Sequence, residues 1–297
     1  MYLLLNYLLI LMAVVVEFVI GGAAALRSPR WTLDWLAWLE RVAGEQDWWR
    51  GWIAVIAIIG LPAIGVAVGF ALIEGISSVL GYVFGLVVLV LMLGPEDLAA
   101  EVDWHKRAAN AAEVSGPALV PPAYIRHAAP VDLGPATGDE EFDSARDELA
   151  ALALAAEHAW FQPVFWFLVL GPVGAVMYRL CANLRRSEGL SGELAHKIAS
   201  VREALEFVPA RISVIALGVA GTLVPVLDCA RHSGLMTWGA SATLVARSAL
   251  AATDNGRIRE VIGGDAQVYR INQMHALLRR AMAVWLVLAA ALALAAA

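Results

Sequence analysis

Charged side chains that lie inside apolar stretches are the residues of this sequence best suited to chemistry. Glu17 interrupts an apolar run over residues 2–25, where a carboxylate must be protonated, paired with a cation or turned towards water. Arg179 and Arg211, which lie at or near the ends of later apolar runs, are its expected partners. The pairing predicts either a buried polar site shared by several helices or a structural ion pair that fixes their packing.

A second candidate is the pair Glu157 and His158, directly before an apolar run. A histidine beside a carboxylate titrates near neutral pH, so this pair could bind or transfer a proton. The same two residues could instead end a solvated helix at a membrane interface. Arg257 and Arg259 form a third charged cluster, which could hold a phosphate or act as a positive anchor on the cytoplasmic side.

Motifs with a known catalytic or metal-binding mechanism are absent from the sequence. There is no phosphate-binding glycine loop, no His-Glu-x-x-His pair, no calcium-binding loop and no Gly-x-Ser-x-Gly elbow, and the 6 histidines lack metal-ligand spacing. The 2 cysteines, Cys181 and Cys229, are interpreted as small buried residues. We therefore predict neither a metal nor a cofactor, and we assign no catalytic residue.

The elements that must position these residues are membrane helices. Hydrophobic residues make up 60% of the chain and charged residues only 16%, against about 25% in soluble domains. With a mean hydropathy of +0.70, this composition indicates an integral membrane protein without a soluble catalytic domain. The net charge of −6 excludes the basic surface that nucleic-acid binding requires.

Hydropathy predicts an all-α fold, a polytopic transmembrane helical bundle of about six spans. Five spans is the alternative, because the last run is rich in alanine. Residues 236–253 could be a surface helix, a re-entrant segment or a further span, and Arg247 in their middle favours the surface. The predicted spans are residues 2–25, 52–73, 78–94, 160–180, 208–227 and 281–297.

Tryptophans mark an additional helix between the first two spans. Trp31, Trp35, Trp38 and Val42 recur at helical spacing and form one stripe. Tryptophan prefers the headgroup level of a bilayer, so residues 31–47 are predicted to be an amphipathic helix in the membrane interface. A helix packed against the bundle would have the same pattern and is the alternative.

Composition divides the chain into an N-terminal membrane region, an acidic region and a C-terminal membrane region, which are residues 1–94, 95–158 and 159–297. The acidic region has 13 acidic and 4 basic residues and is interpreted as a solvated face rather than a metal site. Helices are predicted over residues 96–113 and 139–158, with a loop over about residues 115–138 between them.

The distribution of basic residues predicts the orientation of the bundle, since cytoplasmic loops are enriched in Lys and Arg. Three large polar regions together hold 15 such residues, whereas the loop on the other side, residues 181–207, holds 4. This bias places the N-terminus outside and the large polar regions in the cytoplasm. The three polar regions are residues 26–51, 95–159 and 228–280.

Two segments resemble the AmpE/CobD family of membrane proteins. The first is Phe161–Leu180, which reads FQPVFWFLVLGPVGAVMYRL, and the second is Glu203–Ser213, which has Val-Pro-Ala-Arg at its centre. Glu17 in the first span and the Gly-Pro-Glu-Asp-Leu exit of the third span, residues 94–98, are also similar to the family. The order and spacing of these segments match over nearly the whole chain.

The resemblance implies one of two functions. The CobD branch is a cobalamin-pathway ligase that joins an aminopropanol phosphate to a corrinoid carboxylate, and it carries a Glu-Asn-Thr run before the fourth span. Here residues 156–159 read Ala-Glu-His-Ala, and only Glu157 is left of that run. With Trp166 and the pair Gly171-Pro172, the chain resembles the AmpE branch instead.

The AmpE branch implies an inner-membrane signalling modulator of β-lactamase induction in the response to β-lactam antibiotics. We expect a regulator rather than an enzyme. This regulator would sense a small cell-wall-derived or nucleotide ligand. An ATP-dependent amide-forming ligase of the CobD kind is the alternative, and a scaffold that contacts partners through residues 95–158 is a third interpretation. The candidate ligand-binding residues are Glu17, Glu157, His158, Tyr178, Arg179 and Arg211.

Overall fold

The computed structural model describes residues 2–20, 30–44, 46–93, 131–135, 138–184, 192–253 and 265–295. All regular secondary structure in these ranges is helical, which confirms the predicted all-α class. The helix predicted over residues 96–113, the Arg257 and Arg259 cluster and most of the predicted 115–138 loop lie outside the described residues. The chain forms two compact units, which are considered separately below.

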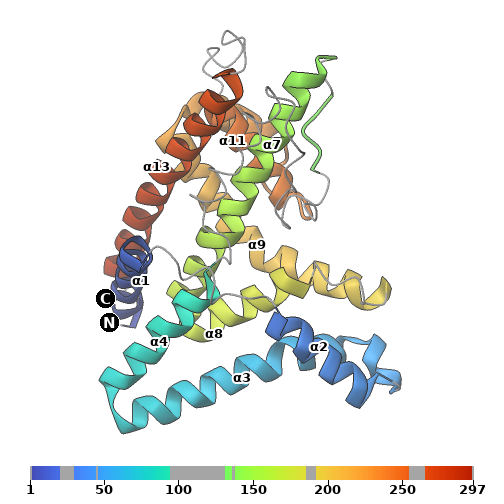
Figure 1. The fold of residues 1–297 in the computed structure, drawn as a ribbon, viewed down its shortest axis with the longest axis vertical. Coiled ribbons are helices and arrows are strands. Elements are labelled where there is room, and N and C mark those ends of the chain that lie inside the picture. Colours follow the sequence, from blue (N-terminus) through green and yellow to red (C-terminus); the bar gives the residue numbers. More distant parts are fainter. Residues whose placement is uncertain are drawn as a thin grey trace. The chain divides into compact units, whose positions relative to one another are not determined.

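Unit 1 contains residues Met1–Pro95, His158–Glu206 and Ala289–Ala297. In this unit, α3 and α4 form a hairpin with Ser77 between them, and both helices pack against α8 (Figure 1). Helix α1 packs against α4 and α8. The helices of the unit are α1 (Tyr2–Ile20), α2 (Arg30–Ala43), η2 (Asp47–Arg50), α3 (Trp52–Ile76), α4 (Ser78–Met92), α8 (Gln162–Leu184) and the first half of α9 (Gly192–Ala220).

The amphipathic helix expected from the tryptophan stripe is α2, and it packs against α3 and α8 as the alternative interpretation required. Trp31, Trp38 and Val42 stay exposed beside its buried face. The sequence does not separate these two faces, because they are adjacent on the helix. Whether the exposed tryptophans lie in a membrane interface stays a prediction. The buried residues of α2 are Thr32, Leu36, Leu39 and Ala43.

Prolines inside α3, α8 and α9 each leave one backbone carbonyl without its donor in the helix. A proline has no amide hydrogen, so the carbonyl four residues earlier loses its helical partner and must find another donor. Water is absent from the core of a bilayer, which makes this requirement stricter there. The prolines are Pro62, Pro172 and Pro209, and the carbonyls four residues before them belong to Ile58, Leu168 and Leu205.

A side chain from another helix donates a hydrogen bond to each of these three carbonyls. Trp35 Nε1 of α2 lies 2.9 Å from Ile58 O, Asn6 Nδ2 of α1 lies 3.2 Å from Leu168 O, and Trp166 Nε1 of α8 lies 2.9 Å from Leu205 O. The contacts therefore attach α2 to α3, α1 to α8 and α8 to α9. Each contact pairs a carbonyl that lacks its helical donor with a side-chain N–H, and both groups would be costly to leave unpaired in hydrocarbon.

A kink in α8 occurs at the Gly171-Pro172 pair. Gly171 has a φ of 64°, a conformation that glycine adopts without the strain of a side chain. A Cβ atom at this position would lie 2.5 Å from the hydroxyl oxygen of Tyr2. The glycine thus allows both the kink and the close approach of α1.

Unit 2 contains residues Glu96–Glu157 and Phe207–Leu288. Helix α11 packs against α7 (Figure 1) and against α10. Helix α7 confirms the helix predicted over residues 139–158. The helices of the unit are α7 (Glu140–Ala156), the second half of α9, α10 (Leu223–His232), α11 (Ser241–Thr253) and most of α13 (Asp265–Ala295).

Residues 236–253 contain α11, whose 13 residues span about 20 Å at 1.5 Å per residue, short of the roughly 30 Å of a hydrocarbon core. Arg247 lies 3.0 Å from the Asp132 carboxylate and donates to the Asp132 carbonyl. The buried residues are Ser241, Leu244, Val245, Ala246, Ser248, Ala249 and Ala252. Helix α11 is therefore neither a span nor a loose surface helix but part of the packing of unit 2.

Three described helical stretches are long and apolar enough to cross a membrane, and the count of about six spans is not confirmed. They are Trp52–Ile76, Phe142–Leu184 and Val268–Ala295, and the shorter apolar helices are Tyr2–Glu17 and Ser78–Met92. The predicted span over residues 208–227 is broken, since α9 ends at Ala220 and α10 begins at Leu223. Thr222 Oγ1 donates to the carbonyls of Ala251 and Ala252 at this break, a contact that hydropathy does not reveal.

Candidate functional site

The candidate site is a cluster of polar side chains between α8 and the first half of α9, both in unit 1. Its central residue, His158, lies in the π-helical turn η3 (Glu157–Phe161) that precedes α8. Such widened turns are found often at functional sites, because the extra residue changes the direction in which side chains point. The side chain of His158 keeps 25% of its surface exposed, whereas Tyr178 is fully buried.

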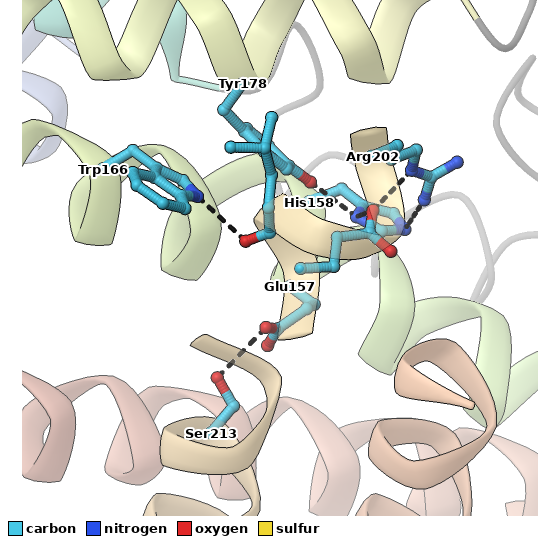
Figure 2. Close-up of polar contacts among 8 residues, drawn as sticks. Glu157, His158, Trp166, Tyr178, Arg202 and Ser213 are labelled. Atoms are coloured by element: carbon cyan, nitrogen blue, oxygen red, sulfur yellow. Dashed lines mark hydrogen bonds and ion pairs between the residues drawn. The ribbon is translucent and has the colours of Figure 1, made fainter. Parts of the chain in front are cut away.

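Both ring nitrogens of His158 have partners (Figure 2). Nδ1 lies 2.8 Å from the Tyr178 hydroxyl oxygen, and Nε2 lies 3.0 Å from Arg202 Nη2. Arg202 Nε donates a hydrogen bond to Glu206 Oε1, which is also 3.6 Å from His158 Nδ1. The cluster thus links a tyrosine, a histidine and a buried arginine–glutamate pair.

These contacts determine the protonation state of the imidazole. A guanidinium group only donates hydrogen bonds, so Nε2 of His158 must accept from Arg202 and cannot carry a proton. The neutral ring then has its hydrogen on Nδ1 and donates to the Tyr178 oxygen, with the Glu206 carboxylate close by. Protonation of Nε2 would direct an N–H at a cation, and the contact with Arg202 would have to break.

The Arg202–Glu206 pair is buried, with side chains that are 9% and 6% exposed. Burial alone lowers the pKa of Arg202, but the negative charge and hydrogen bond of Glu206 outweigh this effect, so the pKa of the guanidinium lies above its usual value. Arg202 therefore stays charged. Removal of either partner would leave an uncompensated charge in the unit 1 core.

The hydrogen bond from Trp166 Nε1 to Leu205 O adjoins this cluster (Figure 2). Leu205 directly precedes Glu206 on α9, and its carbonyl has no donor within the helix because residue 209 is a proline. The indole therefore holds the turn of α9 that carries Arg202 and Glu206 at a fixed distance from α8. The cluster is positioned by contacts between backbone and side chain as well as by its own ion pair.

The predicted site residues fall into separate places. His158 and Tyr178 are brought together, whereas Arg179, on the same helix as Tyr178, donates from Nε to the Met92 carbonyl at 2.8 Å. Glu17 is half-buried in α1. The predicted pairing of Glu17 with Arg179 or Arg211 stays a prediction.

The other two predicted residues make contacts within unit 2. Glu157 is buried, and its carboxylate accepts a hydrogen bond from Ser213 Oγ at 3.1 Å. Arg211 lies over the Phe207 ring, with its guanidinium carbon 3.6 Å from the ring centroid. It donates to the Leu235, Phe207 and Thr237 carbonyls and to Ser241 Oγ. Arg211 therefore holds the turn between α10 and α11.

Arg202 and Glu206 were not among the residues predicted from the sequence. Their spacing of four positions is the signal that could have found them, because it places an arginine and a glutamate on one helix face. Glu206 also lies in the Glu203–Ser213 segment that carries the family resemblance. Charge counting treated Arg202 only as a loop cation, and helix α9 was not predicted to begin before residue 208.

Within the described ranges, no group of three or more His, Cys, Asp and Glu side chains could hold a metal ion. Cys181 is buried, Cys229 is half-buried, and both thiols are free. The cluster around His158 offers instead one accessible imidazole backed by a buried cation, an arrangement suited to hydrogen bonding with a polar ligand or to proton exchange.

The fold and the site together define an all-helical protein with three described stretches that are long and apolar enough to cross a membrane, and with a polar cluster between α8 and α9 in unit 1. No protein-family model, curated protein or solved structure matches the chain.

Proposed function

We propose that this chain is a multi-pass protein of the bacterial inner membrane that regulates β-lactamase induction, as the AmpE branch of the family it resembles does. The observation that carries the proposal is the origin of the His158 cluster. Tyr178 comes from the Phe161–Leu180 segment and Glu206 from the Glu203–Ser213 segment, the two segments that carry the resemblance. Residues that are far apart in the sequence thus contribute to one polar site.

The place of His158 in the chain supports a regulator rather than a ligase. It directly follows Glu157, which is all that is left of the Glu-Asn-Thr run of the ligase branch, so an imidazole stands where that run carries its amide. The imidazole is neutral and held by Tyr178 and Arg202. Hydrogen bonds of this kind can be exchanged for bonds to a ligand without any covalent step.

A small cell-wall-derived or nucleotide ligand would reach the cluster at the exposed part of His158. Such a ligand carries oxygen acceptors that compete for Arg202, and it would separate the guanidinium from the ring. Because Trp166 and Arg202 hold α9 against α8, the exchange would loosen that contact. This is how binding would be passed to the rest of the protein.

The membrane placement is part of the proposal. The apolar helical stretches Trp52–Ile76, Phe142–Leu184 and Val268–Ala295 support insertion. The excess of Lys and Arg in the three large polar regions supports an external N-terminus, with those regions in the cytoplasm.

The test is β-lactamase activity after exposure to a β-lactam, in a strain deleted for the gene, with and without the gene on a plasmid. We expect induction to be lost on deletion and restored by the plasmid. A matched plasmid that carries a stop codon after residue 30 is the control for plasmid effects. Unchanged induction in the deletion strain would contradict the proposal.

A further inference from the structure

The apolar run over residues 160–180, predicted as the fourth span, does not form one straight helix. A straight helix rises 1.5 Å per residue, so residues 158 and 178 would be about 30 Å apart along it. In the structure, His158 Nδ1 lies 2.8 Å from the Tyr178 hydroxyl oxygen (Figure 2). Two side chains cannot bridge the length of a straight helix, so the chain reverses its direction between these two residues.

The reversal occurs at Gly171, where φ is 64°. Gly174, which follows it, lies close against the part of α8 that precedes the reversal, because a Cβ atom at Gly174 would clash with the Trp166 carbonyl oxygen. Eight residues of a straight helix would separate these two groups by about 12 Å. Helix α8 therefore consists of two segments that pack against each other as a hairpin, residues 162–170 and residues 172–184.

The tip of this hairpin is apolar, whereas its open end is polar. Val169 and Leu170, directly before the reversal, are 41% and 43% exposed. The Leu168 carbonyl beside them accepts a hydrogen bond from Asn6, which satisfies irregular backbone as membrane depth requires. His158 and its polar partners lie at the other end. These features suit a re-entrant hairpin, which enters a bilayer and leaves it on the same side.

The predicted fifth span, residues 208–227, also returns to the place where it begins. Arg211, near the start of the run, donates to the Leu235 carbonyl at 2.8 Å and to Ser241 Oγ at 2.6 Å, both of which follow the run. The part of α9 in unit 2 and α10 are about 21 and 15 Å long, each short of the roughly 30 Å of a hydrocarbon core. The residues before and after this run therefore lie on the same side of a membrane.

We propose that neither run crosses the membrane, and that residues 160–180 form a re-entrant hairpin whose open end faces the cytoplasm. The hairpin points outward, because Gly171 at its tip lies against Tyr2, at the external start of α1. Residues 181–207, which six spans would place outside, then lie in the cytoplasm. Their 4 Lys and Arg residues join the 15 of the three large polar regions, as the positive-inside tendency favours.

The hairpin determines from which side a ligand reaches the cluster of the proposed function. The members of the cluster, His158, Tyr178, Arg202 and Glu206, lie at the open end of the hairpin. A polar solute of the cytoplasm would therefore meet the exposed part of His158, and a solute outside the membrane would not. This conclusion rests on the proposed function and its membrane placement, whereas the reversal of α8 depends on neither.

The test is the labelling of single cysteines in the full chain by a membrane-impermeant maleimide, in intact spheroplasts and after permeabilisation. The background carries Cys181→Ala and Cys229→Ala. Ser144→Cys on α7 is the cytoplasmic control, and Ser78→Cys at the turn between α3 and α4 is the external control. Both serines are exposed. We expect Ser78→Cys to be labelled in intact spheroplasts and Ser144→Cys only after permeabilisation.

His196→Cys and His232→Cys are the test variants, at exposed positions before and after the predicted fifth span. We expect both to be labelled only after permeabilisation, as Ser144→Cys is. Labelling of His196→Cys in intact spheroplasts would overturn the proposal and leave the regulatory function untouched. Equal labelling of the two control variants would contradict the membrane placement in the proposed function, and the cytoplasmic open end with it.

Gly174→Ala tests the reversal without reference to either side of the membrane. In a straight helix, alanine is the better helix former and would stabilise the protein. In the hairpin, its methyl group meets the Trp166 carbonyl oxygen, so we expect a lower melting temperature in detergent. The matched control Gly65→Ala, whose added Cβ has no described atom within 4 Å, should not lower it. A melting temperature of Gly174→Ala at or above that of the wild type would overturn the hairpin.

Discussion

At the residue scale, the imidazole of His158 is held on both sides, by Tyr178 at Nδ1 and by Arg202 at Nε2. The tautomer follows from the chemistry of arginine alone, because a guanidinium cannot accept a hydrogen bond. The histidine is therefore an acceptor for Arg202 only as long as it is neutral. A substitution of His158 should therefore disturb the hydrogen bonds of the cluster more than a substitution of any other member.

Replacement of Tyr178 by phenylalanine tests the cluster. The change removes the hydroxyl that accepts from Nδ1 of His158 and leaves a part-buried donor without its partner. We expect a loss of stability of about 1–3 kcal/mol, measured by chemical denaturation in detergent. Tyr269→Phe, at an exposed tyrosine of α13, is the matched control and should change little. Equal effects of the two substitutions would show that the Tyr178 hydroxyl contributes nothing.

A second prediction at this scale concerns Asp132. The backbone N–H of Gly134 and the charge of Arg247 lower the pKa of the Asp132 carboxyl below its usual value. A carboxyl whose pKa is lower in the folded protein stabilises it above the unfolded pKa of about 4, and that contribution is lost as the pH falls through the folded pKa. Melting temperatures of the wild type and Asp132→Asn should therefore differ at pH 6 and converge towards pH 3.

The control for this prediction is Asp228→Asn, which changes a carboxylate in a loose, exposed pair with Arg231. Its melting temperature should stay close to that of the wild type at each pH. A difference between wild type and Asp132→Asn that stays constant from pH 6 to pH 3 would contradict the assigned cause.

The sequence identified His158 and Tyr178 as candidates, but it did not show that they touch or that Arg202 and Glu206 complete the site. Histidine and charged residues beside apolar runs are visible in one dimension. The contact depends on how α9 lies against α8, and this is set by Trp166 and the carbonyl of Leu205. Nothing in the local sequence predicts that hydrogen bond, since it joins residues 39 positions apart.

At the element scale, the helices are joined where prolines leave carbonyls free. The indole of Trp166 takes the place of the missing amide of Pro209 at Leu205 O, and Trp35 and Asn6 do the same for α3 and α8. Each proline therefore removes one hydrogen bond from its own helix and leaves a carbonyl that accepts a hydrogen bond from a neighbouring helix. A tryptophan near a proline-containing helix should be considered for this role before it is assigned to a membrane interface.

The pair Trp166 and Pro209 gives a test by double mutation. Trp166→Phe removes the indole N–H and should destabilise the protein by about 1–3 kcal/mol, because the Leu205 carbonyl is left without a donor. Pro209→Ala adds an amide hydrogen that can bond to that carbonyl within α9. The double variant should therefore be more stable than the sum of the two single effects predicts.

Trp52→Phe, at an exposed tryptophan, is the matched control and should show no such coupling with Pro209→Ala. Denaturation in detergent measures the three single variants and the two double variants that combine Pro209→Ala with Trp166→Phe or Trp52→Phe. Additive effects of Trp166→Phe and Pro209→Ala would contradict the proposed exchange of donors.

Hydropathy predicted the positions of α3 and α4 closely, because both helices are almost entirely apolar and the charged Glu74 lies in the last turn of α3. Hydropathy failed at residues 208–227, where one apolar run covers the end of α9 and the start of α10. The break is stabilised by Gly221, whose Cβ position would lie 2.8 Å from the Ala252 carbonyl oxygen, and by Thr222. Both depend on the packing of α11, which a sliding window cannot detect.

At the scale of the whole molecule, composition was the most informative property. Few charges and long apolar runs indicated a membrane protein, and three described helical stretches are long and apolar enough to cross a membrane. The number of spans could not be predicted in the same way, since several apolar helices are too short or lie within packed units. The proposed regulatory function depends on the resemblance and on the site that its two segments form.

The measurement that tests this account most directly is β-lactamase induction in the deletion strain complemented with His158→Gln or with His196→Gln. Both substitutions remove an imidazole, but His196 is exposed on α9 and outside the cluster. With equal amounts of protein in the membrane fraction, we predict that His158→Gln fails to restore induction and that His196→Gln restores it fully. Full induction with His158→Gln would show that the cluster has no part in signalling and would contradict the central claim.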